Sequence, residues 1–438
     1  DGDSVDVEVI TKDVWAIGAE VEITDIDAGN LRIFDNNILG LGRVLDNRIF
    51  WDVAKGDKLG YDGILRLDNI GGSFINGAIQ LINYYGTQSY RANLNRSFYT
   101  PNIKYAGGIN VEYMTTFQRV NVWDTALSPI EYRNAGYWIG RSFTLNKENI
   151  NPVRTNIIIT GGMNYYKFLQ RPHYLTENSY YRFHDRLLTL GSVSFTRQGF
   201  YKSNLIYSFG RTEDIPFGYL VSLTGGIESG EFKKRYYSKI QAAHGSYIGN
   251  YGYAYASFEM GSFWHKDTSE QVVTRAQLNY FSNLTELGLH SIRHFVNITY
   301  VQGNRMYTDD YLTVNRRSDI RGFRDDSIRG LSKLTMSYEC NLFTPYYLLG
   351  FRFAVFAFTD VTMIGYQAGV FKGDTYYGIG AGIRLKNERL VFPAVLIRFA
   401  FYPNVNESSK FSMIDVLGES KLNPRDFYIR QPDIVRFQ

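Results

Sequence analysis

The sequence predicts an all-β fold, a transmembrane antiparallel β-barrel, on three observations. Aromatic residues make up 16% of the 438 residues, with 35 Tyr and 30 Phe against only 10 Pro. Apolar and polar residues alternate from end to end of the chain, and no capped segment with a helical period interrupts them. Apolar runs are short, and none reaches the roughly 20 residues that a membrane helix needs.

Alternation with a period of two gives each predicted strand an apolar face and a polar face. In Tyr90–Asn95, Tyr, Ala and Leu share one face, and Arg, Asn and Asn share the other. A dry core would make the polar face costly, whereas a water-filled barrel hydrates it and lipid covers the apolar face. A soluble array of sheets such as a propeller is the alternative, but the sequence has no repeat of constant period to favour it.

The alternating segments define candidate strands, joined by short turns such as 386–389 and by long polar loops at 302–330 and 404–425. Some of these segments are expected to extend a neighbouring hairpin. They begin near Val14, Leu39, Leu59, Ser73, Ser89, Lys104, Tyr132, Val153, Leu187, Tyr201, Gly218, Tyr236, Tyr251, Val272, Arg293, Leu331, Gly350, Tyr376, Phe392 and Phe427.

Charge and side-chain chemistry exclude several classes of function. The 47 Lys and Arg residues nearly balance 43 Asp and Glu residues, unlike the basic surface of a nucleic-acid-binding protein. A single cysteine, Cys340, excludes an internal disulfide. The histidines lack metal-ligand spacing, so we expect no metal and no cofactor. The first residues lack signal-peptide regions, so we expect a removed leader or a longer precursor.

The stretch from 318 to 365 carries a family resemblance. It contains Arg321-Gly322-Phe323 directly after Ile320, and Phe358-Thr359-Asp360 on a later predicted strand. This pattern resembles the sixth extracellular loop and the following hairpin of the bacterial surface-antigen superfamily. That superfamily includes the BamA/TamA outer-membrane assembly factors and the two-partner-secretion transporters. The resemblance covers the C-terminal third of the chain.

The resemblance implies a barrel of about 16 strands with a long loop inserted into the lumen. Arg321 at the loop tip would pair with an acidic residue of a nearby strand, because its planar fork can hold a carboxylate through two hydrogen bonds. Asp360 and Glu339 are the candidate carboxylates, beside Phe358. Gly322 permits a turn next to a bulky neighbour. An ordinary ion pair inside the barrel is the alternative interpretation.

The resemblance also bears on domain organisation. Gly330 and Phe343–Pro345 fit the strand and turn between the two motifs. Residues 1–13 are expected to end a periplasmic, POTRA-like segment, and residues 14–438 to form the barrel. We expect the first strand near Trp15 and the closing strand over 427–437, bounded by Phe427 and Phe437. A weak seam between these strands would serve as a lateral gate.

Three functions follow as hypotheses. The resemblance implies an outer-membrane protein of a Gram-negative bacterium that assists insertion, assembly or translocation of other surface proteins, whose strands add at the seam. Expected partners are outer-membrane lipids and lipopolysaccharide, client outer-membrane proteins and lipoprotein or periplasmic subunits, but not nucleic acid. A barrel that anchors or exports a soluble domain or lipoprotein is the second hypothesis. The third is a lipid hydrolase using His244 and Ser246, although we expect structural roles for both and no enzyme.

Overall fold

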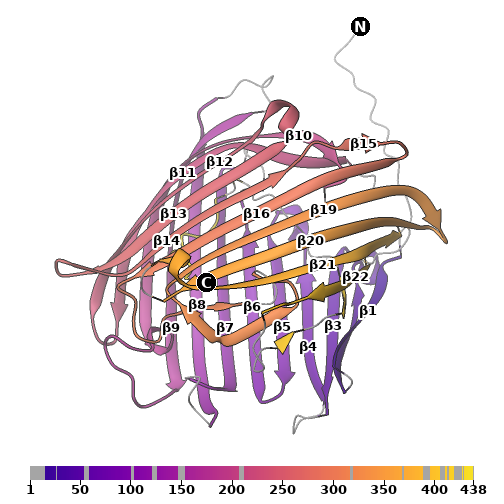
Figure 1. Cartoon of the computed structure of the whole chain (residues 1–438). Coiled ribbons are helices and arrows are strands. Elements are labelled where there is room, and N and C mark those ends of the chain that lie inside the picture. Colours follow the sequence, from indigo (N-terminus) through magenta and orange to yellow (C-terminus); the bar gives the residue numbers. More distant parts are fainter. Residues whose placement is uncertain are drawn as a thin grey trace.

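The computed structural model consists almost entirely of antiparallel strands (Figure 1). It describes residues 15–25, 27–53, 59–99, 103–120, 126–146, 153–206, 212–315, 319–366, 369–387, 395–404, 410–411, 414–418, 427 and 429–437. The predicted periplasmic segment at 1–13 lies outside these ranges. Within them, no helix combines the length and the apolar character needed to cross a membrane. The all-β class and the antiparallel pairing predicted from the alternation are confirmed.

One sheet of 21 strands winds into a barrel-shaped wall, and each strand pairs with its neighbour along the chain. The three-residue β15 continues β14 beside β16, so the wall has 20 strand positions. The strands are β1 (Ile17–Asp25), β2 (Ala28–Asp35), β3 (Arg43–Asp52), β4 (Leu59–Leu67), β5 (Asn76–Tyr84), β6 (Thr87–Arg96), β7 (Tyr105–Gln118), β8 (Ser128–Thr144), β9 (Arg154–Gln170), β10 (Arg186–Asn204), β11 (Thr212–Gly230), β12 (Lys234–Tyr247), β13 (Tyr253–His265), β14 (Thr268–Phe281), β15 (Thr285–Leu287), β16 (His290–Asn304), β19 (Ser332–Leu348), β20 (Phe351–Gly365), β21 (Asp374–Asn387), β22 (Val395–Phe401) and β24 (Ile414–Gly418).

A second, three-stranded sheet belongs to the connections of the wall. It joins β17 (Leu312–Val314), β18 (Phe323–Gly330) and β23 (Lys410–Phe411), in that order. The described connections also contain single turns of 3-10 helix: η1 (Ile38–Gly40), η2 (Ile70–Gly72), η3 (Tyr181–Phe183), η4 (Gly249–Tyr251) and η5 (Val370–Lys372).

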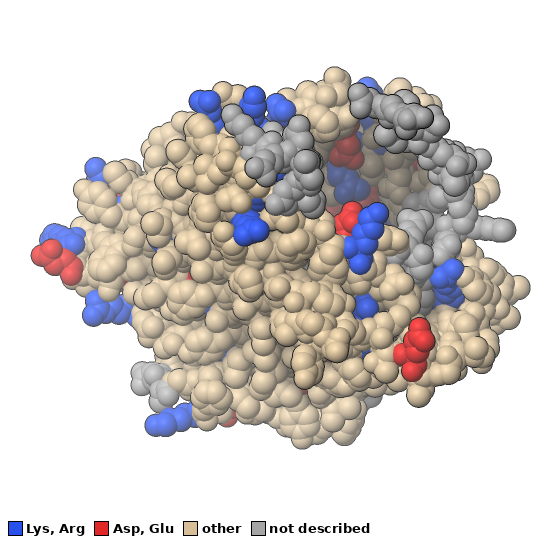
Figure 2. Space-filling model, turned by 90° about the horizontal axis from the view of Figure 1, so that it is seen from above, with Lys and Arg blue, Asp and Glu red and all other residues tan. Residues whose placement is uncertain are grey.

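The two faces of the wall have opposite character. On β10 and β11, the paired residues Val193 and Leu223 point outward and are 54% and 59% exposed. Their neighbours Ser194 and Ser222 point inward, are buried, and share a hydrogen bond of 2.8 Å. Seen from above, the molecule is hollowed, and acidic and basic side chains lie in the hollow (Figure 2). The alternation therefore places apolar residues outside and polar residues inside, as predicted.

Tight hairpins fix the register of the strands. Tyr85 and Gly86 connect β5 to β6, and Leu349 and Gly350 connect β19 to β20, all four with positive φ. Two such residues in succession give a turn whose twist matches that of the strands. The turn expected at Phe343–Pro345 is therefore wrong: these residues lie within β19, at a register shift between Phe343 and Tyr347.

Strand length varies around the wall. Strands β1 to β6 have 8 to 10 residues, and β22 and β24 have 7 and 5. Strands β7 to β14 have 13 to 19 residues. The short strands thus lie at both edges of the sheet, and the long ones lie between them.

The closing strand is not where the sequence predicted it. The edges of the sheet are β1 and β24, whose Cα atoms come within 8 Å of each other, and no backbone pairing joins them within the described ranges. Residues 427 and 429–437 form no strand and lie against the inner wall. Pro432 lacks a backbone donor, and Phe427, Ile429 and Val435 are buried away from the edges. The expected count of about 16 also differs from the 20 positions seen.

Glycines of β21 make room for aromatic rings of β20. A Cβ atom on Gly380 would lie 2.5 Å from the Phe358 ring and 2.3 Å from the Phe399 carbonyl oxygen. We expect Gly380→Ala to lower the free energy of unfolding by about 1–3 kcal/mol through overpacking. Urea unfolding followed by tryptophan fluorescence measures this. Gly161→Ala is the control, because its nearest neighbour would be 3.9 Å away. Equal stability of the two variants would contradict the packing argument.

Candidate functional site

The loop between β16 and β19 folds into the barrel, and its tip contacts β20. Arg321 donates from Nε and Nη2 to the two carboxylate oxygens of Asp360, both at 2.8 Å. Its backbone N–H donates to Asp360 Oδ2 at 3.0 Å. Asp360 is 0% exposed, so this charged fork provides the partners that its carboxylate would otherwise find in water. The structure brings together these two predicted residues, and their role in function remains a prediction.

Glu339 on β19 provides a second carboxylate at the tip. Arg321 donates from Nη1 to Glu339 Oε2. Asn341 Nδ2 and Arg384 Nη2 donate to the other oxygen, Oε1, at 2.9 and 3.3 Å. Asp360, Glu339 and Arg384 come from three adjacent strands of the wall, β20, β19 and β21. We call Arg321, Asp360, Glu339 and Arg384 the Arg321 cluster.

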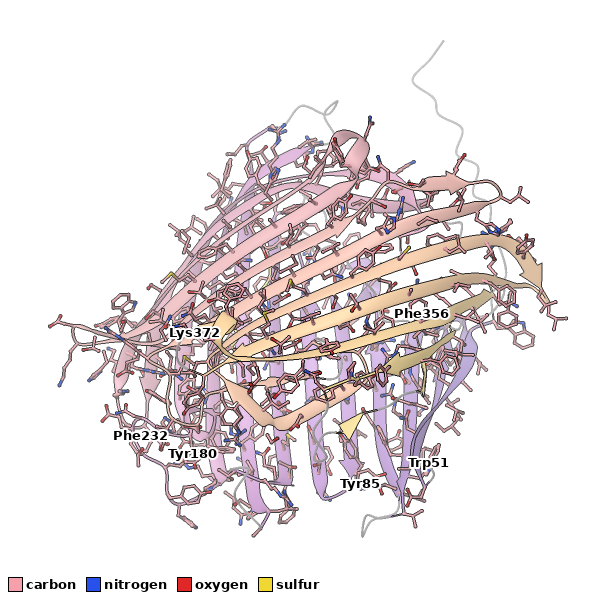
Figure 3. The ribbon with its side chains drawn as sticks, viewed as in Figure 1. Trp51, Tyr85, Tyr180, Phe232, Phe356 and Lys372 are labelled. Atoms are coloured by element: carbon pink, nitrogen blue, oxygen red, sulfur yellow. The ribbon has the colours of Figure 1, made fainter. Side chains whose placement is uncertain are left out.

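Aromatic side chains complete the binding site of the loop tip on the inner wall. The Arg321 guanidinium lies 4.0 Å from the centre of the Phe358 ring, which itself stacks on Phe356, labelled in Figure 3. Phe323 is buried and stacks on Tyr376, with ring centres 6.1 Å apart. Tyr402 donates its hydroxyl to the Arg321 carbonyl at 2.6 Å. These contacts fix the tip on both its polar and its apolar sides.

Backbone geometry explains the other two tip residues. Gly322 has φ of +86°, a conformation that residues with a Cβ rarely adopt, so it allows Arg321 and Phe323 to point to different partners. Ile320 is buried and packs near Gly378, where a Cβ atom would lie 3.1 Å from it. All four predicted tip residues therefore help to hold the loop tip against the inner wall.

The pinned loop also reaches the edge of the sheet. Directly after the tip, Phe323 and Arg324 of β18 pair with Phe411 and Lys410 of β23. Strand β23 precedes the edge strand β24 by two residues. The Arg321 cluster is therefore connected through β18 and β23 to the last strand of the wall.

The predicted seam residues are placed differently from one another. Trp15 is exposed directly before β1, at one edge of the sheet. Phe427 is buried against Tyr255 of β13, with ring centres 5.6 Å apart. Phe437 packs in the same apolar cluster as Val435. The last two lie on the inner wall, and only Trp15 lies beside an edge strand.

Sequence reasoning missed a second buried arginine. Arg235 on β12 is 1% exposed and donates from Nη2 and Nε to Glu228 at 2.6 and 2.9 Å. Its Nη1 donates to Glu270, Gln271 and Tyr307 at 3.1, 2.8 and 3.0 Å. We call these five residues the Arg235 cluster. Its partners are too scattered along the chain for a motif, and the only signal is a basic residue on the polar face of β12.

The Arg235 cluster holds two loops at one end of the wall. Tyr181 of the 171–185 loop donates to Glu228, and Tyr307 belongs to the 305–311 loop. The two loops also contact each other, because the backbone N–H of Tyr180 donates to Asp309 at 2.6 Å. Phe232, labelled in Figure 3 with Tyr180, lies in the connection from β11 to β12 and packs on His184 of the 171–185 loop, with ring centres 4.8 Å apart.

The alternative chemistries find little support in the geometry. His244 and Ser246 share the outer face of β12, but Ser246 donates its hydroxyl to the Tyr247 carbonyl at 3.3 Å. No hydrogen bond joins His244 to Ser246 in the part of the chain that the structure describes. Over the same residues, no group of three or more His, Cys, Asp and Glu side chains is arranged to hold a metal ion.

The chain has matches among solved structures. No family model matches it, and neither does any curated protein. BamA from Haemophilus ducreyi lacking POTRA domains 1–3 is similar at 10% identity with a TM-score of 0.46, over 92% of this chain and 74% of that one. CdiB from Escherichia coli matches at 11% identity and a TM-score of 0.43, over 93% and 62%. CdiB from Acinetobacter baumannii matches at 10% identity and 0.44, over 91% and 58%.

Energetic coupling between Arg321 and Asp360 can be measured directly. Removing one partner of a buried ion pair costs about 3–5 kcal/mol. We expect Arg321→Met and Asp360→Asn each to lower the free energy of unfolding, and the double variant to lose less than their sum. Exchanging the two charges should not restore stability, because a carboxylate introduced in place of Arg321 would face Glu339. Arg197→Met, at an exposed position of β10, is the control. Additive losses would contradict the pairing.

Docking of the 305–311 loop should depend on pH. Burial raises the pKa of the Asp310 carboxyl to about 6, while Gln271 donates to it at 2.7 Å and Asp309 and Arg235 lie nearby. The docked loop therefore holds a proton more readily than the free loop, and docking weakens as pH rises from about 4 to 6. After correction for intrinsic rates, hydrogen exchange of 305–311 should be faster at pH 7 than at pH 5. Asp310→Asn should remove this difference between the two pH values. If the difference persists in Asp310→Asn, another titratable group causes the pH dependence.

Proposed function

We propose that the chain is an outer-membrane barrel of a Gram-negative bacterium that assists the insertion, assembly or translocation of other outer-membrane or surface proteins. Client strands would add at the seam, which we define as the gap between β1 and β24. The observation that carries this proposal is that the two edges approach without backbone pairing in the described ranges. Unpaired edge groups are a template for an added strand.

The character of the wall supports a position in a membrane. Apolar side chains such as Val193 and Leu223 are exposed on its outer face, and the polar residues point inward. Strands β7 to β14, with 13 to 19 residues, exceed the 9–11 residues that a tilted strand needs to cross a bilayer. Lipids and lipopolysaccharide would therefore surround the wall.

The edges of the sheet are suited to opening. Strand β24 has five residues and β22 has seven, so few backbone hydrogen bonds hold this edge to the rest of the wall. In a bilayer, an unpaired backbone group is costly because lipid offers no partner. A client strand that pairs with β1 or β24 would remove this cost. The exchange needs neither a cofactor nor a catalytic residue.

The Arg321 cluster has a defined place in this proposal. Because β18 pairs with β23, directly before β24, a loop tip that is held firmly also positions the seam. Loss of Arg321 would then impair client assembly by displacing the edge strand. Lipoprotein or periplasmic subunits would act as further partners by delivering clients to this edge.

One observation favours a second candidate function. The loop carrying Arg321 and residues 427 and 429–437 occupy the interior of the barrel. A barrel with a filled interior could serve as an anchor for a soluble domain or a partner lipoprotein. In such an anchor, the seam would stay closed.

Cross-linking the seam separates the two candidates. Val21→Cys on β1 is combined with single cysteines at 414–418, in a Cys340→Ala background. If the seam opens in function, a cross-link that forms should abolish surface-protein assembly in cells, and reduction should restore it. The control is Val21→Cys with Leu31→Cys, a directly opposite pair of β1 and β2, which leaves the seam free. Normal assembly with the seam cross-linked would favour the anchor.

A further inference from the structure

The C-terminal segment, residues 427 and 429–437, runs along the inner wall from one end of the barrel to the other. Phe427 packs against Tyr255 and near Gly245, at the end of the wall where β12 turns into β13. Phe437 packs near Gly303 and Met306, at the opposite ends of the strands, where the long loop after β16 begins. The segment therefore passes through the barrel in an extended form.

Three glycines hollow the inner wall beneath this segment. A Cβ atom on Gly245 would lie 2.9 Å from the Phe427 ring, and one on Gly303 would lie 2.6 Å from the Phe437 ring. A Cβ atom on Gly261 would lie 3.0 Å from a methyl group of Val435. The three positions come from β12, β16 and β13. The wall therefore has a groove whose depressions match side chains spaced along an extended peptide.

Polar groups of the wall bind the segment as well. Lys239 of β12 forms an ion pair of 2.7 Å with Asp433. The hydroxyl of Tyr237 accepts a hydrogen bond from the backbone N–H of Val435 at 2.8 Å, and Thr196 donates to the Phe427 carbonyl at 3.4 Å. Both contacts to the backbone are independent of the side chains at 427 and 435, so they add to the binding of any extended peptide whose side chains fit the three depressions.

The segment is held less firmly than the loop tip. It pairs with no strand in the described ranges, and Asp433 remains 56% exposed in its ion pair. Water therefore screens this ion pair from its Asp433 side, although Lys239 itself is only 5% exposed. By contrast, Asp360 is fully buried under Arg321. The segment can therefore leave its groove at a cost that a competing peptide would offset.

We propose that the inner wall of β10 to β16 forms a peptide-binding groove and that the C-terminal segment is its exchangeable resident ligand. The groove takes an extended polypeptide with a leading aromatic residue, followed by an acidic residue and a β-branched residue. A client or partner segment with this pattern displaces the C-terminal segment from the groove. This inference rests on the proposed function for the identity of the competitor, but not for the groove itself.

Peptide binding to the full chain in detergent tests the groove. Asp433→Lys places two like charges together and should release the segment; Phe427→Ser/Asp433→Lys removes an apolar anchor as well. Both changes lie on the segment and leave the wall intact. A labelled synthetic peptide of residues 427–437 should bind the released variants saturably, as followed by fluorescence anisotropy. Wild type should bind it at least about tenfold more weakly, because its own segment competes at high effective concentration.

Charge complementarity gives the matched controls. A peptide carrying Asp433→Lys should bind the released variants about fivefold more weakly than the unchanged peptide. Adding Lys239→Glu to Asp433→Lys restores a pair of opposite charges. The C-terminal segment should then bind the groove again and exclude the peptide. Arg436→Glu, an exposed position of the segment, should behave like wild type.

The outcomes separate the groove from the seam. Saturable binding by the released variants with exclusion by wild type supports the proposal. If a folded released variant does not bind the peptide, the wall has no peptide-binding groove. If wild type binds the peptide equally well, the C-terminal segment does not block the groove. Neither result depends on membrane insertion or on client assembly, so failure here leaves the seam cross-linking test unaffected.

Discussion

A wall with an apolar outside and a charged inside must satisfy its inward charges within the barrel. Asp360 and Glu339 project from neighbouring strands into a space that strand pairing alone leaves without partners. The loop tip fills that space, and the guanidinium of Arg321 meets both carboxylates. Removing a buried charge from its partner costs far more than removing an exposed one. The course of the loop follows from this requirement.

The same requirement organises the rest of the interior. Arg235 gathers residues of β11, β14 and the 305–311 loop at one end of the wall, while Lys239 meets Asp433 further along the same strand. Two buried clusters thus fix the loops, whereas the ion pair that holds the C-terminal segment is exposed on its Asp433 side. This gradation in burial divides the interior into parts that stay in place and a part that can exchange.

The sequence was informative where chemistry repeats locally. Alternation predicted the faces of Tyr90–Asn95 correctly: Tyr90 and Leu94 are exposed, and Arg91 pairs with Glu112 inside. Alternation failed where strand length or tertiary contacts determine the structure. β10 has 19 residues, longer than a membrane strand requires, and was divided by a false start at Tyr201. The closing strand expected over 427–437 is not seen: residues 427 and 429–437 pack against the inner wall instead. Arg235 escaped notice because its partners meet only after folding.

In the proposed membrane setting, unequal strand length has a mechanical consequence for the bilayer around the wall. Strands β1 to β6, with 8 to 10 residues, extend about 26–33 Å along their own axes and less across a membrane when tilted. Lipid beside the short strands would have to compress to match this height, at a fraction of a kcal/mol for each ångström of mismatch. The elastic strain would be concentrated on the side where the sheet ends. Acyl-chain length would therefore set how much stored energy the membrane contributes to separating β1 from β24.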